Sequence, residues 1–307
     1  MYRLGWRLLY LVVVCGFISS CAVFDKDMTA GDSFFSPPSG DPISLAYSSE
    51  GRGKPVLLLH GFGASRYSWR YITQTLAKRY RVISIDLKGF GTSPKPRDAR
   101  YSVYEQAHLV SHFIQQQQLS QLTLIGHSFG GGVALASAVY LQKTSPGILK
   151  KLVLIDSMAY PQKLPFFIAA LATPVLGTSV VNILPNSLQV SLLLHKVYFD
   201  DALISWQSIQ EYADNLALKN AKYALVKTAR QLLPVDLMQF SEHFSRLEVD
   251  ALVIHSKEDE IVPLWVAKKI HRALPRSQLR IIENVGHAVQ EEQPGLLLDI
   301  LAGFLNY

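Results

Sequence analysis

Short apolar runs and longer amphipathic stretches alternate along most of the chain. The apolar runs are rich in Val, Ile and Leu, as buried strands are. They are Val56–Leu59, Val82–Ile85, Leu122–Ile125, Leu152–Ile155, Ala251–Ile254 and Leu279–Ile282. Stretches with helical periodicity lie at Arg66–Lys78, Val103–Gln118, Val133–Gln142, Leu264–Leu274 and Gly295–Leu305. Strands that alternate with helices predict an α/β fold with a mostly parallel sheet and helices on both faces.

The alternation stops in the segment 157–248. This segment has no strand-helix repeat and predicts several helices separated by prolines. The prolines are Pro161, Pro165, Pro174, Pro185 and Pro234. We expect a helical cap inserted into a core formed by 42–156 and 249–307. The apolar stretch Leu164–Leu176 is shorter than the about 20 residues of a membrane-spanning helix, so it predicts packing within the cap. A hydrophobic substrate tunnel or a membrane-facing lid is the alternative, and such a lid favours apolar acyl or aromatic substrates.

The N-terminus has the features of a secretory signal. Arg3 and Arg7 precede the apolar stretch Leu8–Phe17, and Ile18-Ser19-Ser20-Cys21 follows as a small-residue cleavage site. The apolar stretch is too short to span a bilayer. Residues 1–20 therefore predict a cleaved signal peptide, with an uncleaved N-terminal anchor as the alternative.

The end of this signal resembles a bacterial lipobox, in which Cys21 is acylated and becomes the first mature residue. More than one acyl chain on a residue is what stable membrane anchoring requires. Ala22 after the cysteine implies delivery to the outer membrane, facing the periplasm, and anchoring in the inner membrane is the alternative. Residues 21–41, rich in Asp, Ser, Gly and Pro, predict a tether between the lipid and the globular body.

Composition narrows the range of partners. The chain has 307 residues, two cysteines and a formal net charge of +6. Because Cys15 lies in the predicted signal and Cys21 is the predicted lipid site, no disulfide is expected in the mature protein. The basic residues are spread without interleaved aromatics, which argues against a nucleic-acid partner. The sequence has no Cys/His metal cluster and no phosphate-binding glycine loop, so we expect no metal and no cofactor. The oligomeric state stays open.

One glycine motif joins a predicted strand to a predicted helix. It reads Gly126-His127-Ser128-Phe129-Gly130. A Gly-x-Ser-x-Gly sequence at such a junction places the serine on a tight, strained turn, since glycine removes the Cβ atoms that would collide there. Ser128 is therefore the candidate nucleophile.

A serine nucleophile requires a base and an acid that orients the base. His287 lies in a glycine-containing loop after the last apolar run and is the candidate base. Asp259 follows the preceding apolar run and is the candidate acid, whereas Glu258 and Glu260 beside it are expected to be solvated.

Backbone N–H groups stabilise the oxyanion of an acyl-transfer reaction. The loop His60-Gly61-Phe62-Gly63 follows an apolar run, and its glycines allow it to fold back toward Ser128. The amides of Phe62 and Phe129 are the expected donors. His60 is expected to bond the loop backbone rather than to take part in catalysis.

From about Pro42 onward these motifs resemble the α/β-hydrolase superfamily, in particular its single-domain enzymes with a helical cap. In chain order they are Leu59–Gly63, Ile85–Ser93, the Ser128 motif, Leu154–Asp156, Asp259–Pro263, and Gly286-His287 followed by Glu291–Pro294. The order Ser128, Asp259, His287 is that of the superfamily. Relatives that cleave halides or epoxides carry Asp at the nucleophile position, so Ser128 disfavours those reactions.

The resemblance implies a serine hydrolase that cleaves a small apolar ester through an acyl-enzyme, as a carboxylesterase or a lipase does. Carbon–carbon bond hydrolases and cofactor-free haloperoxidases of the same fold are the alternatives among enzymes. A non-catalytic surface lipoprotein is the alternative outside them, since a fold does not by itself imply a function. A complete triad weighs against that last alternative.

Overall fold

The computed structural model describes residues 43–305. These residues all belong to one compact unit of the chain. The predicted signal peptide, Cys21 and the predicted tether lie outside the described residues.

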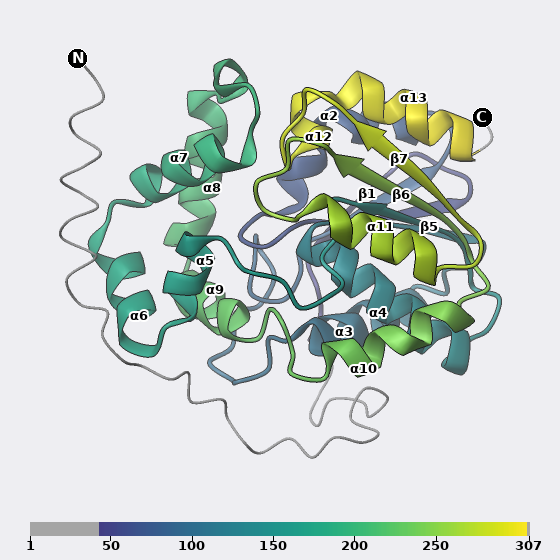
Figure 1. Cartoon of the computed structure of the whole chain (residues 1–307), viewed down its shortest axis with the longest axis horizontal. Coiled ribbons are helices and arrows are strands. Elements are labelled where there is room, and N and C mark those ends of the chain that lie inside the picture. The colour runs from purple at the N-terminus through teal and green to yellow at the C-terminus, as the bar shows by residue number, and fades with distance from the viewer. Residues whose placement is uncertain (1–42, 306–307) are drawn as a thin grey trace. The chain divides into compact units, whose positions relative to one another are not determined.

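Seven strands form one sheet in the order β1-β3-β2-β4-β5-β6-β7 (Figure 1). They are β1 (Tyr47–Glu50), β2 (Pro55–Leu59), β3 (Arg81–Ile85), β4 (Leu122–His127), β5 (Leu149–Ile155), β6 (Asp250–Ser256) and β7 (Ser277–Ile282). β1 pairs antiparallel with β3, and the other pairs are parallel. Each predicted apolar run lies in one of the strands β2–β7. The α/β fold class with a mostly parallel sheet is confirmed.

Helices cover both faces of this sheet. They are α2 (Arg70–Ala77), which continues the 3-10 turn Arg66–Trp69, α3 (Val103–Gln116), α4 (Phe129–Thr144), α11 (Leu264–Ala273), α12 (Val289–Glu292) and α13 (Pro294–Leu305). Side chains alternate along β2, so that Leu57 and Leu59 pack with α3, α4 and α11, whereas Val56 and Leu58 pack with α2 and α13. The sheet therefore supplies two apolar cores, one on each face.

The register brings several strand ends to one edge of the sheet. Leu59 pairs with Gly126, and Ile155 pairs with both His127 and Ile254. The carboxyl ends of four parallel strands, β2, β4, β5 and β6, therefore lie side by side, and ligands bind at this edge in open α/β sheets.

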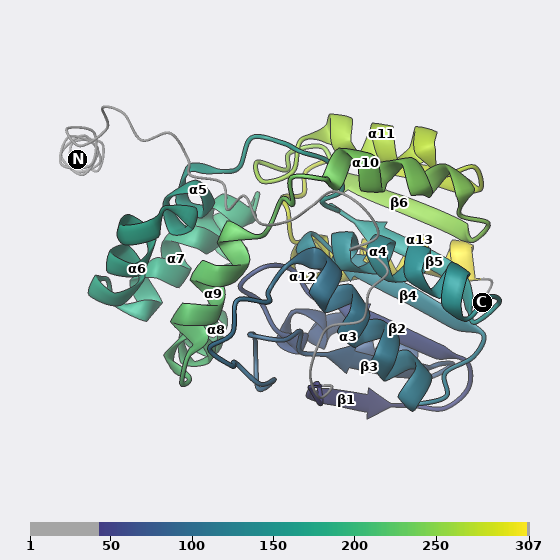
Figure 2. The same cartoon turned by 90° about the horizontal axis from the view of Figure 1, so that it is seen from below.

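The chain between β5 and β6 is helical. Its elements are α5 (Phe166–Ala172), α6 (Pro174–Ile183), α7 (Asn186–Val197), the turn Asp201–Leu203, α8 (Trp206–Ala217), α9 (Ala221–Arg230), α10 (Leu237–Ser241) and the turn Glu242–Arg246. Pro165, Pro174 and Pro185 stand at the starts of α5, α6 and α7, where a missing N–H is tolerated. Figure 2 shows α5–α9 gathered at one side of the sheet. We call residues 157–248 the helical segment.

Within the described part of the chain, no single helix is long and apolar enough to cross a membrane. By length and composition α5 and α6 would qualify only as a pair, and they bend by 111° where they meet.

Candidate active site

Ser128 occupies a strained turn between β4 and α4. Its φ is +55°, a conformation that residues other than glycine rarely adopt. A Cβ on Gly126 would lie 2.3 Å from the Gly130 carbonyl oxygen, and a Cβ on Gly130 would lie 2.4 Å from that of His60. Both positions therefore require glycine, and Ser128 is left at the sheet edge with 5% of its surface exposed.

Asp259 and His287 form a buried hydrogen-bonded pair. His287 Nδ1 lies 2.7 Å from Asp259 Oδ2, and the Asp259 side chain is fully buried. The other carboxylate oxygen accepts from the amides of Ile261 at 2.7 Å and Val262 at 3.0 Å. Burial alone would raise the pKa of Asp259, but His287 and the amide of Val262 outweigh it and lower the pKa below its usual value. With the Nδ1 proton directed at this carboxylate, Nε2 of His287 is free to accept a proton.

The two glutamates beside Asp259 differ from each other. Glu260 is exposed and forms an ion pair with Lys196 at 3.2 Å, as a solvated residue can. Glu258 is half-buried, and its Oε2 accepts from the amide of Asn284 at 2.8 Å. The expectation that Glu258 is merely solvated is therefore wrong, because this carboxylate holds the start of the loop that carries His287.

Among the described residues 43–305, no hydrogen bond joins Ser128 Oγ to the imidazole of His287. His127, the residue before Ser128, contacts His287, and the two imidazole ring centres lie 4.8 Å apart. Bonds between nucleophile and base are often long before substrate binds.

The loop after β2 lies against Ser128. A Cβ on Gly61 would come within 3.2 Å of Ser128 Cβ, a tight contact that glycine avoids. Phe129 is the first residue of α4, where an N–H has no partner within the helix. His60 Nε2 accepts from the amide of Leu87 at 3.0 Å, and its Nδ1 lies 2.8 Å from the Gly61 carbonyl. His60 thus bonds the loop backbone, as the sequence predicts.

His127 holds the backbone of the candidate base His287, a contact that the sequence did not reveal. Its Nε2 donates to the backbone carbonyl of His287 at 2.6 Å, and the amide of Gln290 lies 3.4 Å from its Nδ1. Burial, together with the neighbouring His287, lowers the pKa of His127 to about 3. His127 is therefore a neutral donor that fixes the backbone of His287.

The helical segment also holds the loop of His287. The amide of His287 donates to the carbonyl of Val197 at 2.7 Å. Glu292 in α12 accepts from the amide of Phe199 at 2.8 Å and from that of Gly286 at 2.9 Å. This carboxylate therefore joins the helical segment to the residue before the candidate base, a role that only the fold reveals.

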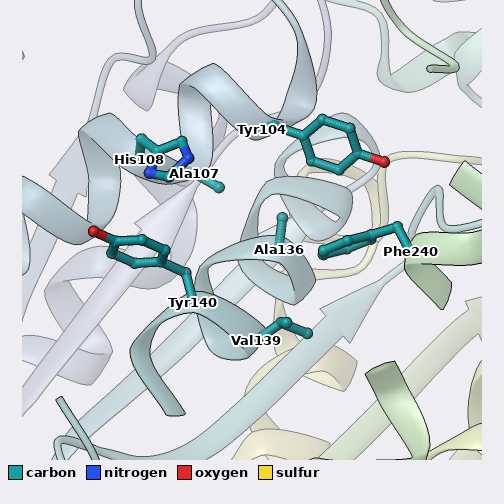
Figure 3. Close-up of a pocket in the computed structure, with 7 residues that line it drawn as sticks. All are labelled: Tyr104, Ala107, His108, Ala136, Val139, Tyr140 and Phe240. Carbon is teal, nitrogen blue, oxygen red and sulfur yellow. The ribbon is translucent and has the colours of Figure 1, made fainter. Parts of the chain in front are cut away.

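An apolar cavity of about 20 Å³ begins at Phe129, next to Ser128. Its lining includes Val103, Met158, Leu232, Leu237 and Phe240. A second cavity, shown in Figure 3, holds about 10 Å³ between α3, α4 and Phe240 of α10, barely the space of one water. None of the site residues lines it. The cavity that Phe129 lines is thus small and apolar.

Two groups of His and Asp side chains within residues 43–305 have potential metal-ligating atoms within 4.8 Å of one another. One contains His127, Asp156 and His287, and the other contains Asp156, His255 and Asp259. Each group includes a member of the Asp259–His287 pair, whose bond a metal would have to disturb. We therefore assign neither group to a metal centre.

Comparison with known proteins agrees with this geometry. Residues 54–294 match the family model described as alpha/beta hydrolase fold. The chain is 32% identical to the uncharacterized hydrolase YugF of Bacillus subtilis, over 85% of this chain and 92% of that protein. It is 29% identical to 2-hydroxymuconate semialdehyde hydrolase of a Pseudomonas species, over 83% and 88% of the two chains. An esterase structure from Exiguobacterium antarcticum covers 86% of this chain and 96% of its own, with a TM-score of 0.73 at 23% identity. By fold, strand-end geometry and sequence, the chain belongs to the α/β-hydrolase family and is a hydrolase of that fold.

Proposed function

We propose that this protein is a serine hydrolase that cleaves carboxylic esters of apolar acids or alcohols. Ser128 is the nucleophile, His287 the general base and Asp259 the acid that orients it. The observation that carries the proposal is the buried bond of 2.7 Å between Asp259 and His287, at the same sheet edge as the strained turn of Ser128.

In this mechanism Ser128 Oγ attacks the ester carbonyl carbon while its proton passes to His287 Nε2. The carbonyl oxygen becomes an oxyanion that accepts from the amides of Phe62 and Phe129. Collapse of this intermediate expels the alcohol, which takes the proton from His287 and leaves an acyl-enzyme. Water then attacks the acyl carbon by the same steps in reverse and releases the acid and Ser128.

The helical segment acts as a cap in this proposal. Its backbone holds the loop of His287 through Val197 and Glu292. The apolar lining between Phe129 and Leu237 favours an apolar group on the substrate.

A fluorophosphonate probe and a series of esters of graded acyl length test the proposal. Wild-type protein should be labelled on Ser128 and should hydrolyse the esters. Ser128→Ala and His287→Ala should each lose about 10⁴-fold or more in turnover, with unchanged circular dichroism. His195→Ala is the control, because His195 is an exposed histidine of the helical segment. Undiminished ester hydrolysis in Ser128→Ala would refute the assignment.

A second candidate is hydrolysis of a carbon–carbon bond in a dienoic acid. The identity to 2-hydroxymuconate semialdehyde hydrolase favours it. Parallel assays with an ester and with a 2-hydroxy-6-oxo-dienoate separate the two, since the substrate with the higher kcat/KM identifies the reaction. Absence of both activities, with no probe label, would favour a haloperoxidase or a binding protein.

We also propose that the mature protein is a lipoprotein, anchored through acylated Cys21 to the outer membrane and facing the periplasm. The support is the order of Arg3, the apolar stretch Leu8–Phe17 and Cys21 in the sequence. Cys21→Ser should abolish fatty-acid incorporation and leave an unprocessed precursor, whereas Cys15→Ser should change neither. Fractionation of the membranes separates outer-membrane from inner-membrane anchoring. Absence of lipid label in the wild type would rule the lipid anchor out.

A further inference from the structure

A second buried carboxyl group, that of Asp156, lies behind the Asp259–His287 pair. Asp156 follows β5, and its amide donates to the carbonyl of Ile254 in β6 at 3.0 Å. Its two oxygens accept from Ser256, Oδ1 from the amide at 2.7 Å and Oδ2 from the hydroxyl at 3.0 Å. The residue is fully buried, so the charge state of this carboxyl must be decided by its neighbours.

The neighbours of Asp156 include no permanent cation. In residues 43–305, no Lys or Arg nitrogen lies within 4.0 Å of its oxygens, and the nearest basic atom is His255 Nδ1 at 3.3 Å. The titratable groups around it are His255 on β6, His127 on β4, Asp259 and His287 on the loops, and Glu292 on α12. Burial lowers the pKa of His255 to about 4 and that of His127 to about 3. Both histidines are therefore neutral at physiological pH.

The two buried aspartates differ in the direction of their pKa shifts. Burial and the negative charge of Asp259 raise the pKa of Asp156 well above its ordinary value, whereas that of Asp259 is lowered. His255 Nδ1 is buried without a hydrogen-bond partner, and a protonated Asp156 oxygen at 3.3 Å is the one donor that the ion-pair geometry places beside it. A neutral Asp156 therefore has a buried acceptor for its proton in His255 Nδ1.

We infer that Asp156 is a reserve acid, neutral while Asp259 is charged and able to take over the negative charge facing His287 when Asp259 is neutral. This inference rests on the proposed role of His287. In Asp259→Asn the repulsion disappears, so Asp156 releases its proton to solvent at a lower pH than before. The resulting carboxylate lies within 4.8 Å of a ligand atom of His287, farther than Asp259 but close enough to stabilise the imidazolium.

The test is a double-mutant cycle of kcat/KM against pH for wild type, Asp156→Asn, Asp259→Asn and the double variant. Asparagine has the shape of the neutral carboxyl, so Asp156→Asn alone should stay within about threefold of wild type. Asp259→Asn should retain turnover that increases with pH as Asp156 ionises. The double variant should lose about tenfold or more beyond Asp259→Asn, the size expected of a nearby unit charge after screening, and its pH-dependent rise should disappear. If the loss of kcat/KM in the double variant equals the product of the losses in the two single variants, the two aspartates act independently and the inference is wrong.

A matched control and an independent readout keep the test decisive. Ser256→Ala in the Asp259→Asn background removes the hydrogen bond from the Ser256 hydroxyl to Asp156 but no ionisable group. The increase of kcat/KM with pH should therefore remain and should shift to higher pH.

Infrared difference spectra should show a protonated carboxyl in the wild type at neutral pH that Asp156→Asn removes. This spectrum needs no turnover, so it separates a failure of the inference from a failure of the proposed function. Absence of that band would overturn the inference even if the double variant did not fold.

Discussion

The sheet and the helical segment are both rich in apolar residues, but they bury them to different extents. Leu57, Leu58 and Leu59 of β2 are completely buried, whereas Val175 and Ile183 of α6 are 78% and 77% exposed. Of the exposed large apolar side chains in residues 43–305, twelve lie in the helical segment and five in the rest. Apolar composition therefore predicts burial for strands covered on both faces, and not for helices covered on one.

The contrast has a sequence counterpart. Residues 164–195 contain no Lys, Arg, Asp or Glu, although α5, α6 and α7 expose much of their surface. In the segment, α7 and α8 pack through their own small cluster, which includes Val190, Leu194, Ile209 and Tyr212 and reaches Ala288 next to the candidate base. Exposed apolar surface of this kind suits an apolar ligand or a membrane, in line with the proposed substrate and anchor.

The largest expected effect concerns the sheet edge. Asp259→Asn should lower kcat by about 10⁴-fold, since the amide disturbs the tautomer of His287. Glu260→Gln next to it should stay within about threefold, because Glu260 is exposed. Steady-state kinetics on one ester checks both variants. The reverse ranking would place the acid at Glu260 and take it away from the buried pair.

Stability should separate the two regions next. Leu58→Ala leaves a cavity between the sheet, α2 and α13 and should cost about 2–5 kcal/mol in the free energy of unfolding. Leu188→Ala on α7 should cost far less, because Leu188 is 45% exposed. Urea denaturation measures both. Equal losses would mean that the helical segment is packed as tightly as the sheet.

The contact between the two regions should affect both stability and turnover. Glu292→Gln replaces one accepting oxygen by an NH₂ group that faces backbone N–H donors, so it should cost about 1–3 kcal/mol and lower kcat through the loop of His287. Glu291→Gln is the matched control, since it breaks the pair with Arg70 and the bond from Tyr212 but leaves Gly286 bonded. If Glu291→Gln loses as much kcat as Glu292→Gln, the loss of turnover comes from general destabilisation and not from the loop of His287.

The smallest expected effect on stability lies at the exposed apolar surface. Val175→Lys should change the free energy of unfolding by less than about 0.5 kcal/mol, as exposed substitutions do. It should nevertheless weaken binding of the full chain to lipid vesicles, measured by co-sedimentation. Ile281→Lys on β7, also exposed, is the control that should leave vesicle binding unchanged. Equal retention of both variants would exclude a lipid-facing role for α6.

The central strands could be predicted because they are buried on both faces and read as continuous apolar runs. β1 could not, since Tyr47-Ser48-Ser49-Glu50 is short, polar and mostly exposed at the sheet edge. Only its antiparallel pairing with β3 makes it a strand. The local pattern of apolar residues thus predicts strands that are buried on both faces. It misses a strand such as β1, which is recognised only by its pairing with a neighbouring strand.

The same division holds at the site. Ser128, Asp259 and His287 could be proposed because each follows a predicted strand, and parallel strands bring such positions to one edge. The partners of Glu258 and Glu292 lie on other segments of the chain, so nothing in their local sequence distinguishes them from solvated acids. Burial and hydrogen-bond partners are properties of the fold.

The bond from the His287 amide to the Val197 carbonyl has a practical consequence for protein engineering. Exchange of the helical segment for that of another hydrolase is an obvious route to a new substrate range. Such a chimera would lose the acceptor that fixes the backbone of His287 unless the new segment supplies a carbonyl in the same place. Substrate range and turnover therefore cannot be redesigned independently in this protein, and a graft should keep Val197 and Phe199 as its boundary.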